Sequence, residues 1–259
     1  MSRLFQNVIL CHVAKHFPVT RLGRPSCDPT ILLHFMILVL QSGMSWRHLQ
    51  ETKCPYDYRT VHNYFRQWTK QSIFKDAYRS LYKLYVTKKK GKYHCIDTSY
   101  IKNIYGQDCT GRNPTDRGRL ATKLSAIVDD TGVPVSLYLC PGNVSDHKTV
   151  QPTLDCRIGR LDSHIPLYAD KGYDSKDTRQ KIRNAKYIDR VGKRRIWTHR
   201  IVNRKRGVVE RFFSWLDKYR RLILRYDALI SSYESMTWLA ACRFVSARIW
   251  NKKIKSVFF

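Results

Sequence analysis

The sequence predicts an α/β protein in which a mixed sheet flanked by helices follows a small all-α domain of the helix-turn-helix type. Apolar residues recur at helical spacing through residues 1–87, and short apolar runs of strand length dominate after residue 92. The residues between them, Lys-Lys-Lys-Gly-Lys at 88–92, form a basic linker. We therefore expect a helical domain at 1–87, a linker at 88–92 and a mixed-sheet domain with C-terminal helices at 93–259.

The first domain contains a helix with clear start and stop signals. Asp28 is suited to cap it, Pro29 to its first turn, and Gly43 to its end. Residues 31–40 are apolar except for His34, so this helix is expected to be buried.

The next helix, from about Thr60, is amphipathic. Val61, Phe65 and Trp68 fall on one face, and Arg66 lies on the opposite, polar face. A further helix is expected at 75–86. Compact helices with one basic face are typical of DNA-contacting modules, and a plain helical cap or dimer platform is the alternative.

The second domain alternates strands and helices in a recognisable order. Strands are expected at 93–97, 99–105, 120–129, 133–140, 165–170 and 187–190, with an Asp-Thr-Gly hairpin turn at 130–132. Helices are expected at 147–160 and 174–184, from about Gly207, and at 236–250, with an irregular basic segment at 191–206. This is the element order of the ribonuclease-H-like fold.

Three carboxylates acquire significance in that fold. Asp97 in HCIDTSY and Asp170 in LYADKGYD each end an expected strand, and Glu210 in GVVERFFSWL lies on an expected helix. The fold places the first and fourth strands side by side at the sheet centre, which would bring Asp97 and Asp170 together, and a later helix would present Glu210.

The charge of the chain points to a polyanionic partner. It has 48 Lys and Arg against 20 Asp and Glu, a net charge of +28, and a pI near 10.0. Nucleic acid is the leading candidate, and a membrane surface is a weaker one because no basic amphipathic helix dominates the charge.

Cysteine usage and the chain start favour a cytoplasmic, nucleoid-associated protein, or a nuclear one in a eukaryotic host. The eight cysteines are scattered without Cys-x-x-Cys spacing, which argues against zinc and fits a reducing compartment. The first residues lack the pattern of a signal peptide, and the longest apolar stretch is about half a membrane span.

Carboxylates gathered in a cationic groove suit metal-dependent phosphodiester chemistry. Two divalent ions about 3.5–4 Å apart stabilise the attacking and leaving oxygens of a phosphoryl transfer. Magnesium, or manganese, prefers oxygen ligands and needs few protein carboxylates. Asp97, Asp170 and Glu210 are therefore candidate catalytic residues and metal ligands.

Each carboxylate also has a structural alternative. Asp97 could cap the turn at Thr98, Asp170 could form an Asx-turn, and Glu210 could pair one helical turn away with Arg206 or Ser214. Asp146 and Asp174 are rivals for metal ligation, although both are better placed as helix caps, and Asp146 is also suited to orienting a ligand from behind.

Basic residues cluster just before Glu210. Phosphate contact is the expected role of this cluster, with Trp197 placed to stack on an unpaired base, and a solvated loop is the alternative. Lys123, together with Arg117 and Arg119, is expected to steady DNA or to pack the loop. The residues expected to contact DNA are Arg66, Lys171, Lys193, Arg194, Arg195, Trp197, Arg200, Arg204, Lys205, Arg206, Arg211, Lys218, Arg220, Arg221 and Arg225.

Several stretches together resemble bacterial insertion-sequence DDE transposases of the fourth and fifth insertion-sequence families, most closely the fifth. The similar stretches are GMSWRHL at 43–49, CIDTS at 95–99, LATKLSAIVD at 120–129, PGNVSD at 141–146, YADKGYD at 168–174, and VVERFFSWLDKYRRL at 208–222. The resemblance runs nearly end to end.

That resemblance implies Asp97, Asp170 and Glu210 as the metal-binding triad. It implies nicking at transposon ends, followed by attack of the freed 3′-hydroxyl on target DNA. The superfamily's Tyr and Lys or Arg near the Glu are replaced by Asn203 and Asp217, while Arg206 is kept. Of the properties that the resemblance implies, contacts to the terminal nucleotides are therefore the least directly supported by this sequence.

The expected partners are double-stranded DNA, at both transposon ends and target, and further copies of the chain in a dimer or larger synaptic complex. Two other functions fit the residues: a catalytically silent or domesticated DNA-binding protein, and a ribonuclease-H-fold nuclease without strand transfer.

Overall fold

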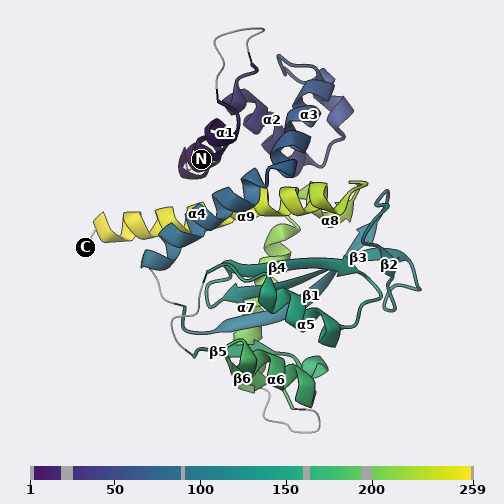
Figure 1. The fold of residues 1–259 in the computed structure, drawn as a ribbon, viewed down its shortest axis with the longest axis vertical. Helices are drawn as coiled ribbons and strands as arrows, with labels where there is room; N and C mark the ends of the chain where they lie inside the picture. Colours follow the sequence, from purple (N-terminus) through teal and green to yellow (C-terminus); the bar gives the residue numbers. More distant parts are fainter. Residues whose placement is uncertain (1–2, 19–25, 89–90, 160–163, 194–199, 258–259) are drawn as a thin grey trace. The chain divides into compact units, whose positions relative to one another are not determined.

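A computed structural model describes residues 3–18, 26–88, 91–159, 164–193 and 200–257 (Figure 1), and the side chains of 88, 200–204 and 250–257 lie outside this description. The chain forms two compact units. Unit 1 comprises Met1–Lys88, Lys218–Ile223 and Ser231–Phe259, and unit 2 comprises Lys89–Asp217 and Leu224–Ile230.

Unit 1 is helical. Its elements are α1 (Arg3–His16), α2 (Pro29–Ser42), a 3-10 helix (Trp46–Glu51), α3 (Tyr58–Lys70), α4 (Ile73–Lys88), α8 (Arg220–Ile223) and α9 (Ile230–Val257) from its second residue onward. The predicted ends of α2 are confirmed, because the Asp28 carboxylate accepts a hydrogen bond from the Thr30 amide and Gly43 adopts a left-handed φ of 72°.

The amphipathic pattern of α3 is also confirmed. Val61, Phe65 and Trp68 are fully buried, and the polar face carries Arg66 in solvent. The helix begins slightly earlier than expected, since the Asp57 carboxylate caps it by accepting from the Arg59 amide.

The C-terminal helix α9 belongs to unit 1, whereas the sequence led us to expect it in the domain at 93–259. Its buried face packs on α4: the rings of Tyr78 and Trp238 lie 5.0 Å apart, and Lys75 pairs with Glu234 at 3.2 Å. The physical reason is that α4 presents an aromatic face that the other N-terminal helices leave available to α9.

Unit 2 contains a mixed sheet in the order predicted for the ribonuclease-H-like fold. The strands are β1 (His94–Asn103), β2 (Gly111–Arg112), β3 (Leu120–Asp129), β4 (Pro134–Pro141), β5 (Pro166–Ala169), β6 (Ile188–Val191) and β7 (Leu224–Arg225). The main path runs β2-β3-β1-β5-β6, with β4 also paired to β3 and β7 to β1. β1, β3 and β4 are antiparallel neighbours, and β5 and β6 run parallel to β1.

One strand differs from expectation. Two strands were predicted on either side of Thr98, but β1 is continuous from His94 to Asn103, so Asp97 lies inside a strand. The reason is that β3 pairs with β1 along nearly its whole length, from His94 opposite Asp129 to Lys102 opposite Ala121. The predicted hairpin turn after Asp129 is confirmed, with Gly132 at a φ of 87°.

Helices cover the sheet of unit 2. α7 (Arg200–Leu216) packs on β1, β3 and β5, and α5 (Asp146–Asp155) packs on β3 and β4. In Figure 1, α7 lies behind the strands and α5 in front of them. α6 (Lys176–Asn184) follows a short 3-10 turn (Lys171–Tyr173) and packs on α5 and β6.

The start of α7 was predicted too late. Residues 191–206 were expected to be irregular because they are densely basic, yet the helix begins at Arg200. Arg206 and Glu210 therefore lie one turn apart on the same helix. Among the helices described, none is both long enough and apolar enough to cross a membrane.

Candidate active site

Asp97 and Asp170 lie where β1 and β5 separate. The last paired residues are Cys95 on β1 and Tyr168 on β5, and each aspartate follows its paired residue by two positions. Side chains two residues apart in a strand point to the same face, so the parallel register directs both carboxylates to the same region. Asp97 is thus positioned by the end of pairing with β5 and not by the end of its own strand.

The guanidinium of Arg206 joins the two aspartates. Its Nη2 atom lies 2.8 Å from Asp97 Oδ2, and its Nη1 atom lies 3.1 Å from Asp170 Oδ1. Glu210 follows Arg206 by one turn of α7, and its side chain is exposed. The structure therefore gathers Asp97 and Asp170 around one cation and places Glu210 beside that cation on the same helix.

Charge and burial oppose each other here. Burial raises the pKa of Asp97 above its ordinary value, and the neighbouring charge of Asp170 raises it further, while Arg206 acts to lower it. For Arg206, burial acts to lower the pKa, but Asp97, Asp170 and Glu210 more than offset this effect and the pKa is raised. The carboxylates thus behave as one coupled charge cluster.

The donor atoms of this cluster fit a hard divalent cation, because all three predicted ligands are carboxylates. Within the described ranges, no group of three or more His, Cys, Asp or Glu side chains is arranged to hold a metal. The fit of the three residues is therefore one of donor chemistry, and Asp97 and Asp170 are in addition joined by their contacts to Arg206.

Asp146, one of the two rival ligands, belongs to a polar network next to Asp97. Its Oδ1 atom accepts from Lys123 Nζ at 2.8 Å and from Thr98 Oγ1 at 3.1 Å. The Thr98 amide in turn donates to Asp97 Oδ1 at 2.9 Å. The predicted cap role is wrong for Asp146, because Ser145 occupies the cap position and Asp146 is the first residue of α5.

Two residues of this network are unusually buried. Lys123 is 2% exposed and also donates to the Val144 carbonyl at 2.6 Å, so its burial does not fit the expected DNA contact. Tyr173 is likewise 2% exposed, and burial, followed by the charges of Asp97 and Asp146, raises the pKa of its hydroxyl well above the ordinary value. Both lie against the aspartate region and contribute to its electrostatics.

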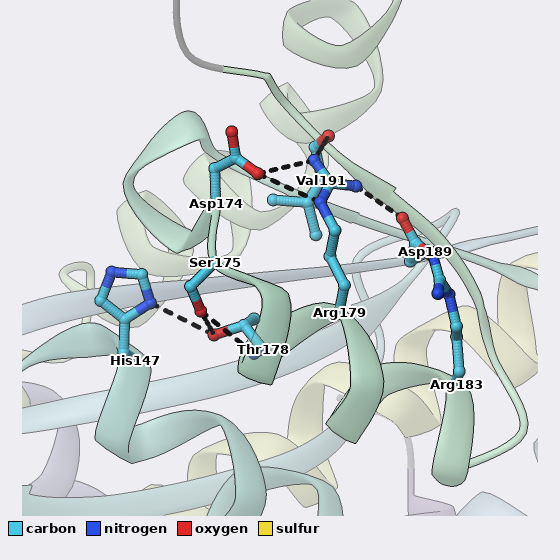
Figure 2. Close-up of polar contacts among 8 residues, drawn as sticks. All are labelled: His147, Asp174, Ser175, Thr178, Arg179, Arg183, Asp189 and Val191. Carbon is cyan, nitrogen blue, oxygen red and sulfur yellow. Dashed lines mark hydrogen bonds and ion pairs between the residues drawn. The ribbon is translucent and has the colours of Figure 1, made fainter.

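Asp174, the other rival ligand, is held by an arginine. Figure 2 shows Arg179 between Asp174 and Asp189, and its guanidinium lies 2.8 Å from Asp174 Oδ1 and 2.6 Å from Asp189 Oδ1. Arg179 also donates to the Val191 carbonyl, and Arg183 binds the second oxygen of Asp189. This cluster ties α6 to β6, so Asp174 has a structural role.

The predicted DNA-contacting residues differ in how exposed they are. Exposed side chains are found at Arg66, Lys171, Lys193, Arg211, Lys218 and Arg220. Lys205 is half-buried, with Nζ 4.4 Å from the centre of the Tyr93 ring, and Arg206 binds the aspartates. Arg194, Arg195 and Trp197 lie outside the described residues, as do the side chains of Arg200, Asn203 and Arg204 on α7.

Two arginines do not fit the expected DNA contact because they are buried. Arg221 is 5% exposed and donates to the Met44 carbonyl at 3.4 Å. Arg225 is fully buried, and its guanidinium binds the Asp108 carboxylate, the Thr122 hydroxyl and the Ala228 carbonyl. Both lie just after the amphipathic helix α7, where the sequence does not distinguish surface from core cations.

No role was predicted for Thr98 or Tyr173 from the sequence. Both follow a predicted catalytic aspartate within four residues, and only that adjacency could have indicated a role in the site. Pairing of Lys123 with Asp146 could not be inferred, because the two residues are 23 positions apart and meet only through the β3–β4 hairpin and the start of α5.

Comparisons with known proteins agree with this description. Residues 85–245 match the family model described as "Transposase DDE domain". The chain is 34% identical over 146 residues to the protein assigned as transposase of the insertion sequence element IS402 from Burkholderia cepacia, which covers 53% of this chain and 69% of that protein.

Among solved structures, the Mos1 mariner paired end complex with Mn aligns over 94% of this chain and 86% of its own, with 10% identity and a TM-score of 0.25. At so low a score the fold assignment rests on the strand order of unit 2 alone.

Proposed function

Because the chain belongs to the DDE transposase family, we propose that it cleaves the ends of a mobile DNA element and joins the freed 3′-hydroxyl to target DNA. The observation that carries the proposal is the meeting of Asp97 and Asp170 where β1 and β5 separate, with Glu210 on the helix packed against both strands. Residues far apart in sequence are united there by the fold.

In this proposal Asp97, Asp170 and Glu210 hold two magnesium or manganese ions. Such ions stabilise the charge on the attacking, leaving and phosphoryl oxygens and lower the pKa of the attacking water. The protein supplies the hard oxygen ligands. The Thr98 amide, which donates a hydrogen bond to the Asp97 carboxylate, orients one of them.

Exposed cations of unit 2 would bind the DNA backbone. Lys171 directly follows Asp170, and Arg211 directly follows Glu210, so both flank the carboxylates in sequence, while Lys193 follows β6. Lys and Arg contacts to phosphate supply affinity that falls with salt. In unit 1, Arg66 on the solvent face of α3 offers a second contact, and handling two DNA ends requires a dimer or larger assembly of the chain.

The proposal is tested with a duplex carrying the inverted repeats that bracket the coding region, incubated with the purified chain and Mg²⁺. Asp97→Asn, Asp170→Asn and Glu210→Gln should each lose strand cleavage while keeping DNA affinity. The matched controls are Asp177→Asn and Glu51→Gln, which change exposed carboxylates that pair with Lys181 and His48, and both variants should cleave normally.

Product analysis separates the related functions. Joined products on a plasmid target support a transposase, whereas cleavage without joining indicates a nuclease of the same fold. DNA binding without any metal-dependent cleavage indicates a silent DNA-binding protein. Cleavage that survives all three substitutions would falsify the assigned triad.

A further inference from the structure

Arg206 is held almost entirely by the carboxylates assigned to catalysis. Its side chain is 12% exposed, and its two terminal nitrogens bind Asp97 and Asp170 at 2.8 and 3.1 Å. Among the described residues, the buried Nε atom has no hydrogen-bond partner. The placement of this guanidinium therefore depends on the two aspartates.

Both oxygens of Asp97 already have a donor. Oδ1 accepts from the Thr98 amide at 2.9 Å, and Oδ2 accepts from Arg206 at 2.8 Å. Asp170 Oδ1 is likewise taken by Arg206. A cation that approached these oxygens would meet a positive charge within hydrogen-bonding distance of two of its three ligands.

The charges show why an arginine is stable there. Three carboxylates gathered without a cation would repel one another, and burial adds to the cost of ionised Asp97. Arg206 supplies one positive charge to this cluster, and the three acids together raise the pKa of its guanidinium. The cluster thus contains its own counter-ion, supplied by α7.

The helix allows that counter-ion to move. Arg206 and Glu210 share a face of α7 one turn apart, so Glu210 can stay in place while the long Arg206 side chain changes rotamer. Arg206 binds two of the carboxylates that the proposed function assigns to the metal ions, and a guanidinium also pairs readily with phosphate.

We propose that Arg206 and divalent metal ions compete for the same carboxylate oxygens, so that metal loading displaces the Arg206 side chain from Asp97 and Asp170. This inference rests on the proposed function, because it takes the aspartates as metal ligands. Arg206 then acts as a positioning residue that limits metal affinity in the absence of DNA.

The experiment measures Mn²⁺ binding to the full chain without DNA, by the electron paramagnetic resonance signal of free Mn²⁺. Arg206→Gln should bind Mn²⁺ about tenfold more tightly than the wild type, since each tenfold corresponds to about 1.4 kcal/mol and charged hydrogen bonds reach that magnitude. The matched control is Arg211→Gln, which removes an equal charge from the exposed residue beside Glu210. It should change affinity less than threefold.

A second variant protects the test against misfolding. Arg206→Lys keeps the charge but offers one ammonium group in place of two parallel donors. Its Mn²⁺ affinity should lie between those of the wild type and Arg206→Gln. Circular dichroism and thermal unfolding establish that each variant is folded.

The outcomes distinguish this inference from the proposed function. Equal affinities in Arg206→Gln and Arg211→Gln, or weaker binding in Arg206→Gln, overturn the competition. Mn²⁺ binding that is insensitive to Asp97→Asn in both the wild-type and the Arg206→Gln backgrounds shows that the metal lies elsewhere, and the proposed function fails first.

Discussion

Lys123 Nζ lies 2.8 Å from Asp146 Oδ1 and belongs to one of the most buried charged side chains of the chain. A buried charge is tolerated only when it is paired and fully hydrogen-bonded. Here the Val144 carbonyl provides a further acceptor, and the Tyr100 ring lies 4.7 Å from the ammonium group. This pair anchors the start of α5 to the strand next to β1.

Lys123→Met should lower the free energy of unfolding by about 1–3 kcal/mol, because Asp146 loses its charged donor at a partly buried position. The comparison is Lys181→Met, which removes the surface pair with Asp177. That pair is shorter, at 2.6 Å, but more exposed, and its loss should cost less than about 1 kcal/mol. Urea unfolding measures both, and equal losses would contradict the argument from burial.

His94 should make the protein sensitive to acid. Burial lowers the pKa of His94 to about 4, although the nearby Asp129 acts to raise it, and the Tyr187 hydroxyl lies 2.8 Å from Nδ1. A depressed pKa contributes stability above the ordinary value of 6.5, and that stability is lost as the pH falls toward 4.

The loss attributable to His94 should approach about 3 kcal/mol, at about 1.36 kcal/mol per pKa unit. Unfolding free energies measured between pH 7 and pH 4 should fall more steeply for the wild type than for His94→Gln, which does not titrate. Parallel curves for the two proteins would show that His94 does not carry this acid sensitivity.

Asp97→Asn should preserve or increase stability at neutral pH while removing activity. The raised pKa means that the folded protein disfavours ionised Asp97, so the stability contributed by this group is present at low pH and is lost as the pH rises through its folded pKa. Unfolding is measured at pH 7 and pH 4 with a chelator present. A variant clearly less stable than the wild type at pH 7 would show that pairing with Arg206 outweighs burial.

Arg225→Met should destabilise unit 2 by about 3–5 kcal/mol, because the Asp108 carboxylate and several backbone carbonyls lose their hydrogen-bond donor. Arg225 joins Asp108 to residues 227–228 through hydrogen bonds to their backbone carbonyls. The control Arg112→Met changes an exposed strand residue and should have little effect. At temperatures where the variant is folded, its DNA affinity should match the wild type, since a fully buried guanidinium cannot reach phosphate.

Local signals predicted the helical ends of unit 1 and the sheet order of unit 2. Asp28 and Gly43 were informative because capping depends on residues within one turn, and the strand order follows from the sequence of element types. The continuity of β1 through Thr98 was not predictable, since it depends on pairing with β3 from Ala121 to Asp129. A single strand cannot reveal how far its neighbour extends.

The active-site prediction was incomplete for a related reason. The sequence identified Asp97 and Asp170 as neighbours, and the structure places them around a shared cation. That cation, Arg206, was assigned to DNA because the preceding basic residues were expected to be irregular. Once α7 begins at Arg200, Arg206 turns toward the strands, and only this tertiary packing decides between a surface cation and an internal one.

Unit 1 is completed by residues at the opposite end of the chain, Ser231–Phe259. On the ribosome, the aromatic face of α4 is therefore synthesised long before α9 exists to cover it, while the sheet of unit 2 has nearly all of its strands by Val191. A nascent chain that stalls before residue 231 therefore leaves Tyr78 without the Trp238 ring that packs against it in the folded unit.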